Sequence, residues 1–285
     1  MNVITVINAK GGCGKSTIAM SLASGLAVRG LSTLLIDMDP QAQVTQWLGA
    51  GDGLSPQGTL VAAMEGSATL DSVIQPTRFE NLSFIASSQG LEDLGRQITD
   101  MEGYSTILSR LLSSLTRSFE FCVIDSPNQI SPVMENCVYS SDAFVVPFES
   151  TKAVRSYANF YQLLLRVRPE EEHRVLHVLS NLSRQPGLRR RVVNALQAQG
   201  IPIAQTEVRT CGWLAQVDEN GGSIFHYRPH AKGAKDMAAL VDEALALVGR
   251  GDLLAREDRT AMPAEVVSTE VAAVNTTHQQ HGETA

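Results

Sequence analysis

The stretch NAKGGCGKST at residues 8–17 limits the fold of this chain more than any other part of its sequence. It follows an apolar run at 2–9 and precedes a segment whose apolar residues recur at helical spacing. A glycine-rich turn between a strand and a helix lets backbone N–H groups close around phosphate oxygens, and the helix N-terminus adds the positive end of its dipole. The sequence therefore predicts a nucleotide-binding α/β protein, and a glycine-rich turn that binds nothing is the weaker interpretation.

The loop departs from the phosphate-loop pattern G-x-x-x-x-G-K-[ST] in one place. Read back from Gly14, Lys15 and Ser16, the first glycine of the pattern is replaced by Ala9, and an additional lysine follows as Lys10. In this pattern the lysine, here Lys15, reaches the β- and γ-phosphates, and the hydroxyl, here Ser16, is a ligand of Mg²⁺. The pattern leaves the additional lysine without a role.

Short apolar runs rich in β-branched residues alternate with longer segments of helical period, which is typical of β-α units that form a parallel sheet. Several runs are apolar on both faces, as strands covered by helices on each side should be. We expect a mostly parallel, twisted sheet flanked by helices on both faces, the architecture of P-loop nucleotide hydrolases. The expected strands are 2–9, 32–39, 82–87, 119–126, 143–148, 174–182 and 201–208.

Helical periodicity is strongest in five segments. The first should end at Gly30 and the third before Pro169, whereas the glycine-rich stretch 49–76 is typical of loops around one or two short helices. The apolar stripes are Ile18, Leu22, Gly25 and Leu26; Ile107, Leu108, Leu111, Leu112 and Leu115; Val154, Tyr157, Ala158, Tyr161 and Leu165; Val192, Val193 and Leu196; and Met237, Leu240, Val241, Ala244 and Leu245.

A chain of 285 residues with 44% hydrophobic residues can bury the core of one large domain. No apolar run is long enough to cross a bilayer, the N-terminus lacks a cleavable leader, and the four cysteines form no C-x-x-C pair. We expect a soluble intracellular protein with one P-loop domain at 1–250. The acidic remainder at 251–285 has no sustained period and is predicted to be disordered.

Three carboxylates follow two of the predicted strands. Asp125 ends the run FCVID, where nucleotide-hydrolysing folds place the carboxylate that holds the Mg²⁺ shell, although it could also cap a turn. Asp37 and Asp39 end the run LLIDMD. Because parallel strands end at the same sheet edge as the phosphate loop, we expect these carboxylates to meet there, with Asp39 placed to orient an attacking water.

Four stretches resemble the ParA branch of the ParA/MinD family of deviant Walker-type ATPases. They are KGGCGKST at 10–17, LLIDMDPQAQVTQWLG at 34–49, CVIDSP at 122–127 and GGSIFHYRPHAKGAKDMAALVDEAL at 221–245. The resemblance covers roughly residues 1–248 and implies an ATPase that uses ATP and Mg²⁺ and forms an ATP-dependent homodimer. In that dimer Lys10 would reach the phosphates of the other subunit's ATP, where a lysine in a water-poor interface is best compensated.

The resemblance also implies a role for each site residue. Hydrolysis would rest on Lys10, Lys15 and Asp39, the Mg²⁺ shell on Ser16, Asp37 and Asp125, and a second switch on DSPNQISP from Asp125 onward. The nucleotide would be bound by Lys10, Gly11, Gly12, Cys13, Gly14, Lys15, Ser16, Thr17, Asn181 and Arg209.

The sequence departs from the family pattern at three places. Asn128 stands where a second proline is usual, and Cys13 stands where valine is more frequent. The adenine-side stretch, which usually contains Ile-Pro, reads TEVRTCG at 206–212 and leaves Asn181 and Arg209 as the candidates for base contacts. None of these changes is expected to abolish ATP binding.

Basic residues concentrate late in the chain. The segment from Arg184 to Lys235 contains eight basic and three acidic residues, in a chain whose formal net charge is −7. A solvated helix face is one interpretation, but ParA proteins bind DNA without sequence preference through late-chain basic residues, and AKGAK at 231–235 occupies a matching place. The predicted DNA-binding residues are Arg184, Arg189, Arg190, Arg191, Arg228, Lys232 and Lys235.

Two other branches of the superfamily remain as alternatives. A MinD-like membrane protein would need a C-terminal amphipathic helix with basic flanks, and the acidic tail without large aromatics does not fit one. A metal-cluster carrier would need a cysteine near the dimer axis, for which Cys137 is the one remote candidate.

The expected function is ATP-dependent positioning of a cargo on the nucleoid, by a cytoplasmic protein that associates with it. ATP-bound dimers would coat nonspecific DNA, and a ParB-like or other cargo adaptor would stimulate hydrolysis. The cargo could be a plasmid, a chromosome region or a protein body such as a carboxysome or chemosensory cluster. Because the first strand begins at Asn2, no N-terminal helix-turn-helix domain and no operator binding are expected.

Overall fold

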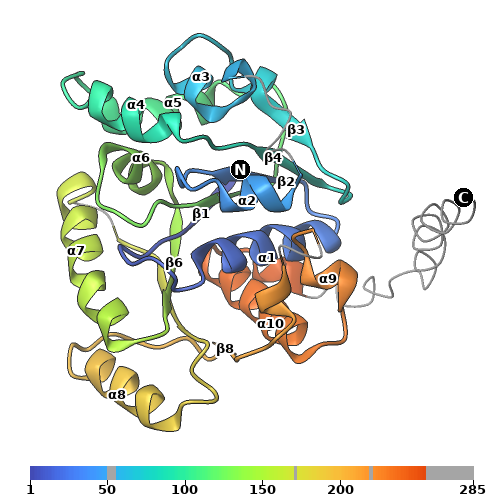
Figure 1. Ribbon diagram of the computed structural model, residues 1–285, viewed down its shortest axis with the longest axis vertical. Coiled ribbons are helices and arrows are strands. Elements are labelled where there is room, and N and C mark those ends of the chain that lie inside the picture. The colour runs from blue at the N-terminus through green and yellow to red at the C-terminus, as the bar shows by residue number, and fades with distance from the viewer. Residues whose placement is uncertain (50–55, 170–171, 218–220, 255–285) are drawn as a thin grey trace, which may run out of the picture.

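The computed structural model describes residues 1–49, 56–169, 172–217 and 221–254 (Figure 1). An eight-stranded sheet runs in the order β3-β4-β2-β5-β1-β6-β7-β8, and every neighbouring pair is parallel except β3 and β4. The mostly parallel sheet predicted from the sequence is therefore confirmed. Its strands are β1 (Asn2–Val6), β2 (Thr33–Asp37), β3 (Ile74–Pro76), β4 (Leu82–Ile85), β5 (Phe121–Asp125), β6 (Ala143–Phe148), β7 (Val175–Ser180) and β8 (Glu207–Val208).

Helices cover both faces of the sheet, as the apolar strands require. They are α1 (Lys15–Val28), α2 (Gln43–Trp47), α3 (Leu60–Met64), α4 (Gly90–Ile98), α5 (Ile107–Ser113), α6 (Pro132–Ser140), α7 (Thr151–Val167), α8 (Pro186–Gln197), α9 (Ile224–Tyr227) and α10 (Lys232–Leu247), with 3₁₀ turns at Pro56–Gly58, Asp71–Val73, Tyr104–Thr106 and Leu214–Gln216. α1, α9 and α10 lie on one face, and α4, α6 and α7 lie on the other (Figure 1).

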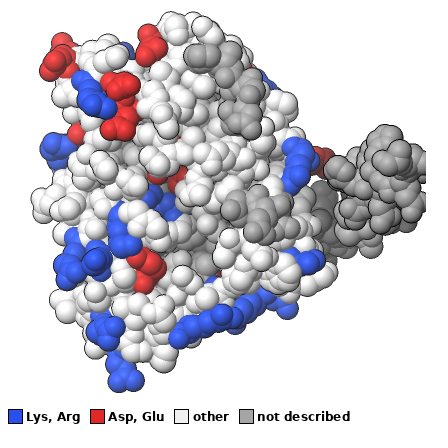
Figure 2. Space-filling model, viewed as in Figure 1, with Lys and Arg blue, Asp and Glu red and all other residues white. Residues whose placement is uncertain are grey.

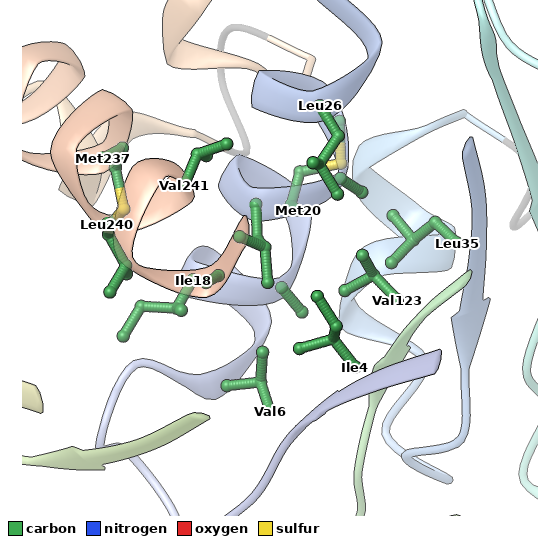
Figure 3. Close-up of a cluster of buried hydrophobic side chains, with 14 of the residues drawn as sticks. Ile4, Val6, Ile18, Met20, Leu26, Leu35, Val123, Met237, Leu240 and Val241 are labelled. Atoms are coloured by element: carbon green, nitrogen blue, oxygen red, sulfur yellow. The ribbon is translucent and has the colours of Figure 1, made fainter. Parts of the chain in front are cut away.

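The core follows the alternation of side chains along each strand. Ile4 and Val6 of β1 pack toward α1 and α10, whereas Val3 packs into the cluster on the opposite face. Figure 3 shows the first cluster, to which β1, α1 and α10 contribute Val6, Ile18 and Leu240. This packing fixes the start of α1, and with it the glycine-rich loop, against the carboxyl end of β1.

The strand predicted at 201–208 is a correction, because only Glu207–Val208 is strand. Most of the preceding segment pairs outside the sheet ladder. The backbone N–H groups of Gln205 and Thr206 donate to the Glu243 carboxylate of α10, at 3.0 Å and 2.5 Å. The Ala204 N–H still donates to the His177 carbonyl of β7 at 2.8 Å, but at the next two residues a side chain of α10 takes the place of the sheet.

The stretch 49–76, predicted as loops around one or two short helices, contains more structure than expected. Beside α3 it holds the antiparallel edge strand β3, in which Ile74 pairs with Ile85 of β4. A three-residue strand is too short to show alternation in the sequence, which is why it was missed. The predicted disorder of the tail falls almost entirely outside the described residues, which end at 254.

Candidate functional site

The glycine-rich loop lies between the end of β1 at Val6 and the start of α1 at Lys15. Gly12 and Gly14 have φ angles of 75° and 88°, in the left-handed region that residues with a Cβ rarely adopt. Gly14 is also the N-cap of α1, and no side chain from the described residues caps this helix. The N–H groups of the first turn are therefore left to face a ligand, and an anion fits them best.

The two lysines of the loop occupy different environments. The Lys15 side chain lies inside the loop, where Nζ donates to the Lys10 carbonyl at 3.1 Å and the residue is 5% exposed. Cys13 Sγ donates to the same carbonyl at 3.2 Å, and burial raises the pKa of this thiol. The cysteine that departs from the family pattern therefore serves as a small buried support for the loop.

Lys10 pairs instead with an acid that the sequence analysis did not identify. Its Nζ forms an ion pair with Glu149, and the two side chains are 23% and 16% exposed. Glu149 follows β6 directly and precedes α7. An acid after an apolar strand is a common pattern, so only the folded arrangement shows that this one lies beside the loop.

The sheet brings the predicted carboxylates to the loop. Asp37 of β2 and Asp125 of β5 are partners in the strand register, and Asp125 is also the partner of Val6 in β1. The two carboxyl groups therefore end adjacent strands at the edge where the glycine-rich loop begins, as the parallel order requires.

Asp37 is fully buried and fully hydrogen-bonded. Its Oδ2 accepts from the backbone N–H and the hydroxyl of Thr45, at 2.9 Å and 2.8 Å, and its Oδ1 accepts from the Asp39 N–H at 3.1 Å. Burial raises the pKa of Asp37 to about 7, although these hydrogen bonds oppose the shift. Sequence reasoning missed Thr45, because nothing in its spacing shows that α2 turns back onto β2.

Asp125 has the opposite surroundings. It is fully buried, and neither of its oxygens accepts a hydrogen bond of good geometry from the described residues. Burial raises its pKa well above the ordinary value, and the nearby Asp37 adds to the rise, while the Ser16 hydroxyl and Lys15 act against it. A buried carboxylate with unpartnered oxygens near a hydroxyl fits a hard cation such as Mg²⁺.

Such a cation would need further ligands. In the described part of the chain, no three His, Cys, Asp or Glu side chains converge in a way that could hold a metal. Mg²⁺ usually keeps several waters and combines one or two carboxylates with phosphate oxygens of a substrate. Ser16 and Asp125 fit that partial ligand set, whereas Asp37 already accepts three hydrogen bonds and fits an orienting role.

Asp39 is held beside these groups by the ends of two strands. Its Oδ1 accepts from the Gln41 N–H at 3.0 Å, and its carbonyl accepts from the Ser87 hydroxyl at 2.6 Å. Ser87, which follows β4, also donates its N–H to the Thr45 hydroxyl at 2.9 Å. Asp39 keeps 8% exposure, so its carboxylate is fixed while retaining limited access to water, which suits a group that orients a nucleophilic water.

A cavity of about 180 Å³ lies against the loop. The structure places both predicted adenine-side residues, Asn181 and Arg209, in its wall, although the Arg209 guanidinium donates to both oxygens of the Asp236 carboxylate. Apolar side chains that sequence reasoning did not assign complete the wall. The lining residues are Gly12, Cys13, Gly14, Thr17, Ile18, Glu149, Ser180, Asn181, Val208, Arg209, Cys211, Leu214, Ala215 and Met237.

The predicted DNA-binding residues lie on or just before α8 and around the start of α10. Two of them have partners, since Arg189 pairs with Glu207 at 2.8 Å and the Arg228 guanidinium lies 4.1 Å from the ring centroid of Trp213. Lysine and arginine side chains gather along the lower edge of the view in Figure 2, on the side where Figure 1 places α8, β8 and α10. All seven are exposed, and the other five are Arg184, Arg190, Arg191, Lys232 and Lys235.

One observation bears on the alternative of a metal-cluster carrier. Cys137 is fully buried within α6, and burial raises the pKa of its thiol well above the ordinary value, so it offers no surface ligand for a metal cluster. Among the helices that can be described, none has the length and apolar content needed to cross a membrane.

Comparisons with known proteins agree with this geometry. A family model described as an AAA domain, AAA_31, matches residues 1–175. The cell division protein PomZ of Myxococcus xanthus is 27% identical over 249 residues, which cover 84% of this chain and 76% of PomZ. The sporulation initiation inhibitor protein Soj of Bacillus subtilis is 25% identical over 251 residues, which cover 86% of this chain and 98% of Soj. The fold matches the solved structure of apo McdA from Cyanothece with a TM-score of 0.75 and 22% identity, over 86% of this chain and 99% of that one.

Proposed function

We propose that this chain, which belongs to the ParA branch of the ParA/MinD family of P-loop ATPases, positions or segregates a cargo by switching between a monomer and an ATP-bound dimer. Its relatives include a chromosome-partitioning ATPase, Soj of Treponema pallidum, and the maintenance of carboxysome distribution protein A of Synechococcus elongatus. The site described above has the residues that such a switch would use.

Each residue of the site has a role in this proposal. The N–H groups of the loop at 10–17 hold the phosphates, Lys15 faces the β- and γ-phosphates, and the cavity wall around Asn181 and Arg209 holds the base. Ser16 and Asp125 would hold Mg²⁺, which would supply positive charge against the phosphates. Asp39 orients the attacking water.

The placement of the two lysines carries the proposal of a dimer. Lys15 is buried within its own loop, whereas Lys10 is partly exposed and forms an ion pair with Glu149, which lines the cavity. A phosphate loop needs one lysine for its own phosphates. The second lysine is therefore available for the phosphates of a nucleotide bound to another subunit, where removal from water makes the attraction strong.

Dimerisation would also create the surface that the switch controls. A dimer presents the basic residues of α8 and α10 twice, which raises the affinity for the DNA backbone and makes it more sensitive to salt. In the cell, ATP-bound dimers would occupy the nucleoid until a ParB-like or other cargo adaptor stimulates hydrolysis. The positioned cargo would be a plasmid, a chromosome region or a protein body.

Lys10→Ala tests the dimer directly. Without the lysine the shared phosphate contact is lost, so we expect a monomer at every ATP concentration when the molar mass is measured by light scattering after size-exclusion chromatography. Lys152→Ala, which removes an exposed lysine at the start of α7, is the matched control and should dimerise as the wild type does. ATP-dependent dimers of Lys10→Ala would exclude the proposed interface.

Asp39→Ala tests the hydrolysis step. Loss of the group that orients water should slow turnover by a factor of at least 100, in line with the usual contribution of general acid–base groups. ATP binding should persist, so the dimer should accumulate and outlive that of the wild type. Phosphate release and light scattering measure the two effects, and normal turnover would remove Asp39 from its assigned role.

A further inference from the structure

The ion pair between Lys10 and Glu149 is not explained by nucleotide binding alone. It lies within one subunit, and it ties up the lysine that the proposed dimer needs for the phosphates of the partner. Lys10 Nζ also donates to the Gly11 carbonyl at 2.9 Å, so the ammonium has two partners in its own chain. Lys10 cannot reach another subunit's phosphates while it keeps both contacts.

Glu149 is fixed in place from two directions. Its Oε1 accepts a hydrogen bond from the Ser150 hydroxyl at 2.9 Å. Ser150 is the N-cap of α7, and its Oγ accepts from the Ala153 N–H at 3.3 Å. Its Oε2 is buried and accepts no hydrogen bond from the described residues. The negative charge of Glu149 is therefore compensated mostly by Lys10. A change at Glu149 would also affect the first turn of α7, through Ser150.

Glu149 also faces the nucleotide cavity. It lines the same space as Gly12 and Gly14 of the glycine-rich loop. A triphosphate in this cavity would bring negative charge close to a carboxylate that is only 16% exposed. Like charges repel strongly where water is scarce, so the bound phosphates would weaken the hold of Glu149 and compete with it for Lys10.

We propose that Glu149 is a positioning residue that holds Lys10 in its own subunit until a bound nucleotide releases it. The pair then acts as a latch that opposes dimerisation in the absence of ATP and adds a cost to dimerisation in its presence. This inference rests on the proposed function, because it concerns the partner exchange of the lysine that would join the two subunits. In this proposal the Glu149 carboxylate links nucleotide binding to the release of Lys10 toward the other subunit.

Glu149→Gln tests the latch, because the amide keeps the shape of the side chain and removes its charge. The experiment uses the full chain in an Asp39→Ala background, so that hydrolysis does not limit the lifetime of the dimer. Monomer–dimer dissociation constants are measured by analytical ultracentrifugation at saturating ATP and Mg²⁺, and again without nucleotide. Saturation removes any effect of the variant on ATP affinity.

We expect Glu149→Gln to lower the dissociation constant of the ATP-bound dimer at least five-fold. Addition of Lys10→Ala should abolish this gain, because the effect acts through the released lysine. Asp242→Asn, which removes a similar partly exposed carboxylate from its pair with Arg29 at 2.7 Å on another part of the surface, is the matched control and should leave the constant unchanged.

An unchanged or larger dissociation constant for Glu149→Gln would overturn the latch while leaving the proposed function intact. If the Asp39→Ala protein itself forms no dimer with ATP, the proposed function fails, and the latch fails with it. Dimers formed with ATP by the variant that combines Glu149→Gln with Lys10→Ala, but not by Lys10→Ala without Glu149→Gln, would also overturn the latch, since Glu149 would then oppose dimerisation without Lys10.

Discussion

The Asp125 carboxylate is buried away from water, and no donor from the described residues forms a well-aligned hydrogen bond with it. Such burial costs free energy unless a ligand compensates it. Asp37, one strand away, is equally buried but accepts three hydrogen bonds. At the scale of single residues, the site therefore contains one carboxylate that the protein satisfies and one with unpartnered oxygens, for which we propose a cation as the ligand.

Asp125→Asn should stabilise the nucleotide-free protein and weaken Mg²⁺-dependent ATP binding. The neutral amide removes the penalty of a buried charge, which we expect to raise the free energy of unfolding by about 1–3 kcal/mol at pH 8. The folded-state pKa of Asp125 is raised, so the penalty is present at high pH and is lost as protonation neutralises the acid. The gain should shrink as the pH falls, which urea unfolding at pH 8 and pH 6 measures.

Asp37→Asn is the contrasting variant. An amide nitrogen would have to face one of the three donors that the Asp37 oxygens now accept, so this change should destabilise the protein. Equal effects of the two substitutions would show that the hydrogen-bond difference between the two sites has no energetic consequence.

Much of the loop chemistry could be predicted from residue type and spacing, whereas its supporting contacts could not. The pattern around Lys15 and Ser16 predicted the strand, turn and helix that the structure contains. Thr45, Ser87 and Glu149 were missed, because their partners lie far away in the sequence and their own neighbours carry no distinctive spacing.

At the scale of elements, α1 and α10 approach each other closely at Gly25. A Cβ built at this glycine would lie 2.7 Å from Val241 Cγ2 and 3.0 Å from Phe225 Cε2. These distances are shorter than carbon–carbon contacts allow, so only glycine fits without movement of the neighbours. The sequence analysis placed Gly25 in the apolar stripe of the helix, but the need for glycine there follows only from the packing.

Gly25→Ala should therefore destabilise the protein even though alanine favours helices. Overpacking of a filled core usually costs about 1–3 kcal/mol, and we expect a loss within that range in urea unfolding. Val241→Ala removes the closest methyl groups, so the double variant should lose less stability than the sum of the two single variants. Additive losses would show that the two side chains do not compete for the same space.

The longer elements were predictable and the shorter ones were not. The apolar runs that became β1, β2, β5, β6 and β7 lie in the middle of the sheet, where burial on both faces leaves a clear pattern. The edge elements β3 and β8 are short and take part of their shape from contacts with other segments, such as Glu243 with the chain before β8. The amphipathic helices α4 and α6 were missed because glycine and polar residues interrupt their stripes.

At the scale of the whole molecule, charge is distributed unevenly. The chain has a formal net charge of −7, yet all seven predicted DNA-binding residues are exposed, on or just before α8 and near the start of α10. A net negative molecule should have little affinity for DNA as a monomer, since the basic surface is small. A dimer that presents this surface twice would bind much more tightly, and each phosphate contact would add to the salt dependence.

The central claim is that ATP controls binding to DNA through the dimer. The most direct test measures binding to nonspecific duplex DNA with ATP, with ADP and without nucleotide, over a salt series, with anionic liposomes as the control surface. We expect ATP alone to confer DNA binding, and the affinity to fall steeply as salt rises. Binding to liposomes in response to ATP, or to neither surface, would contradict the claim and would make the basic residues of α8 and α10 a solvated face.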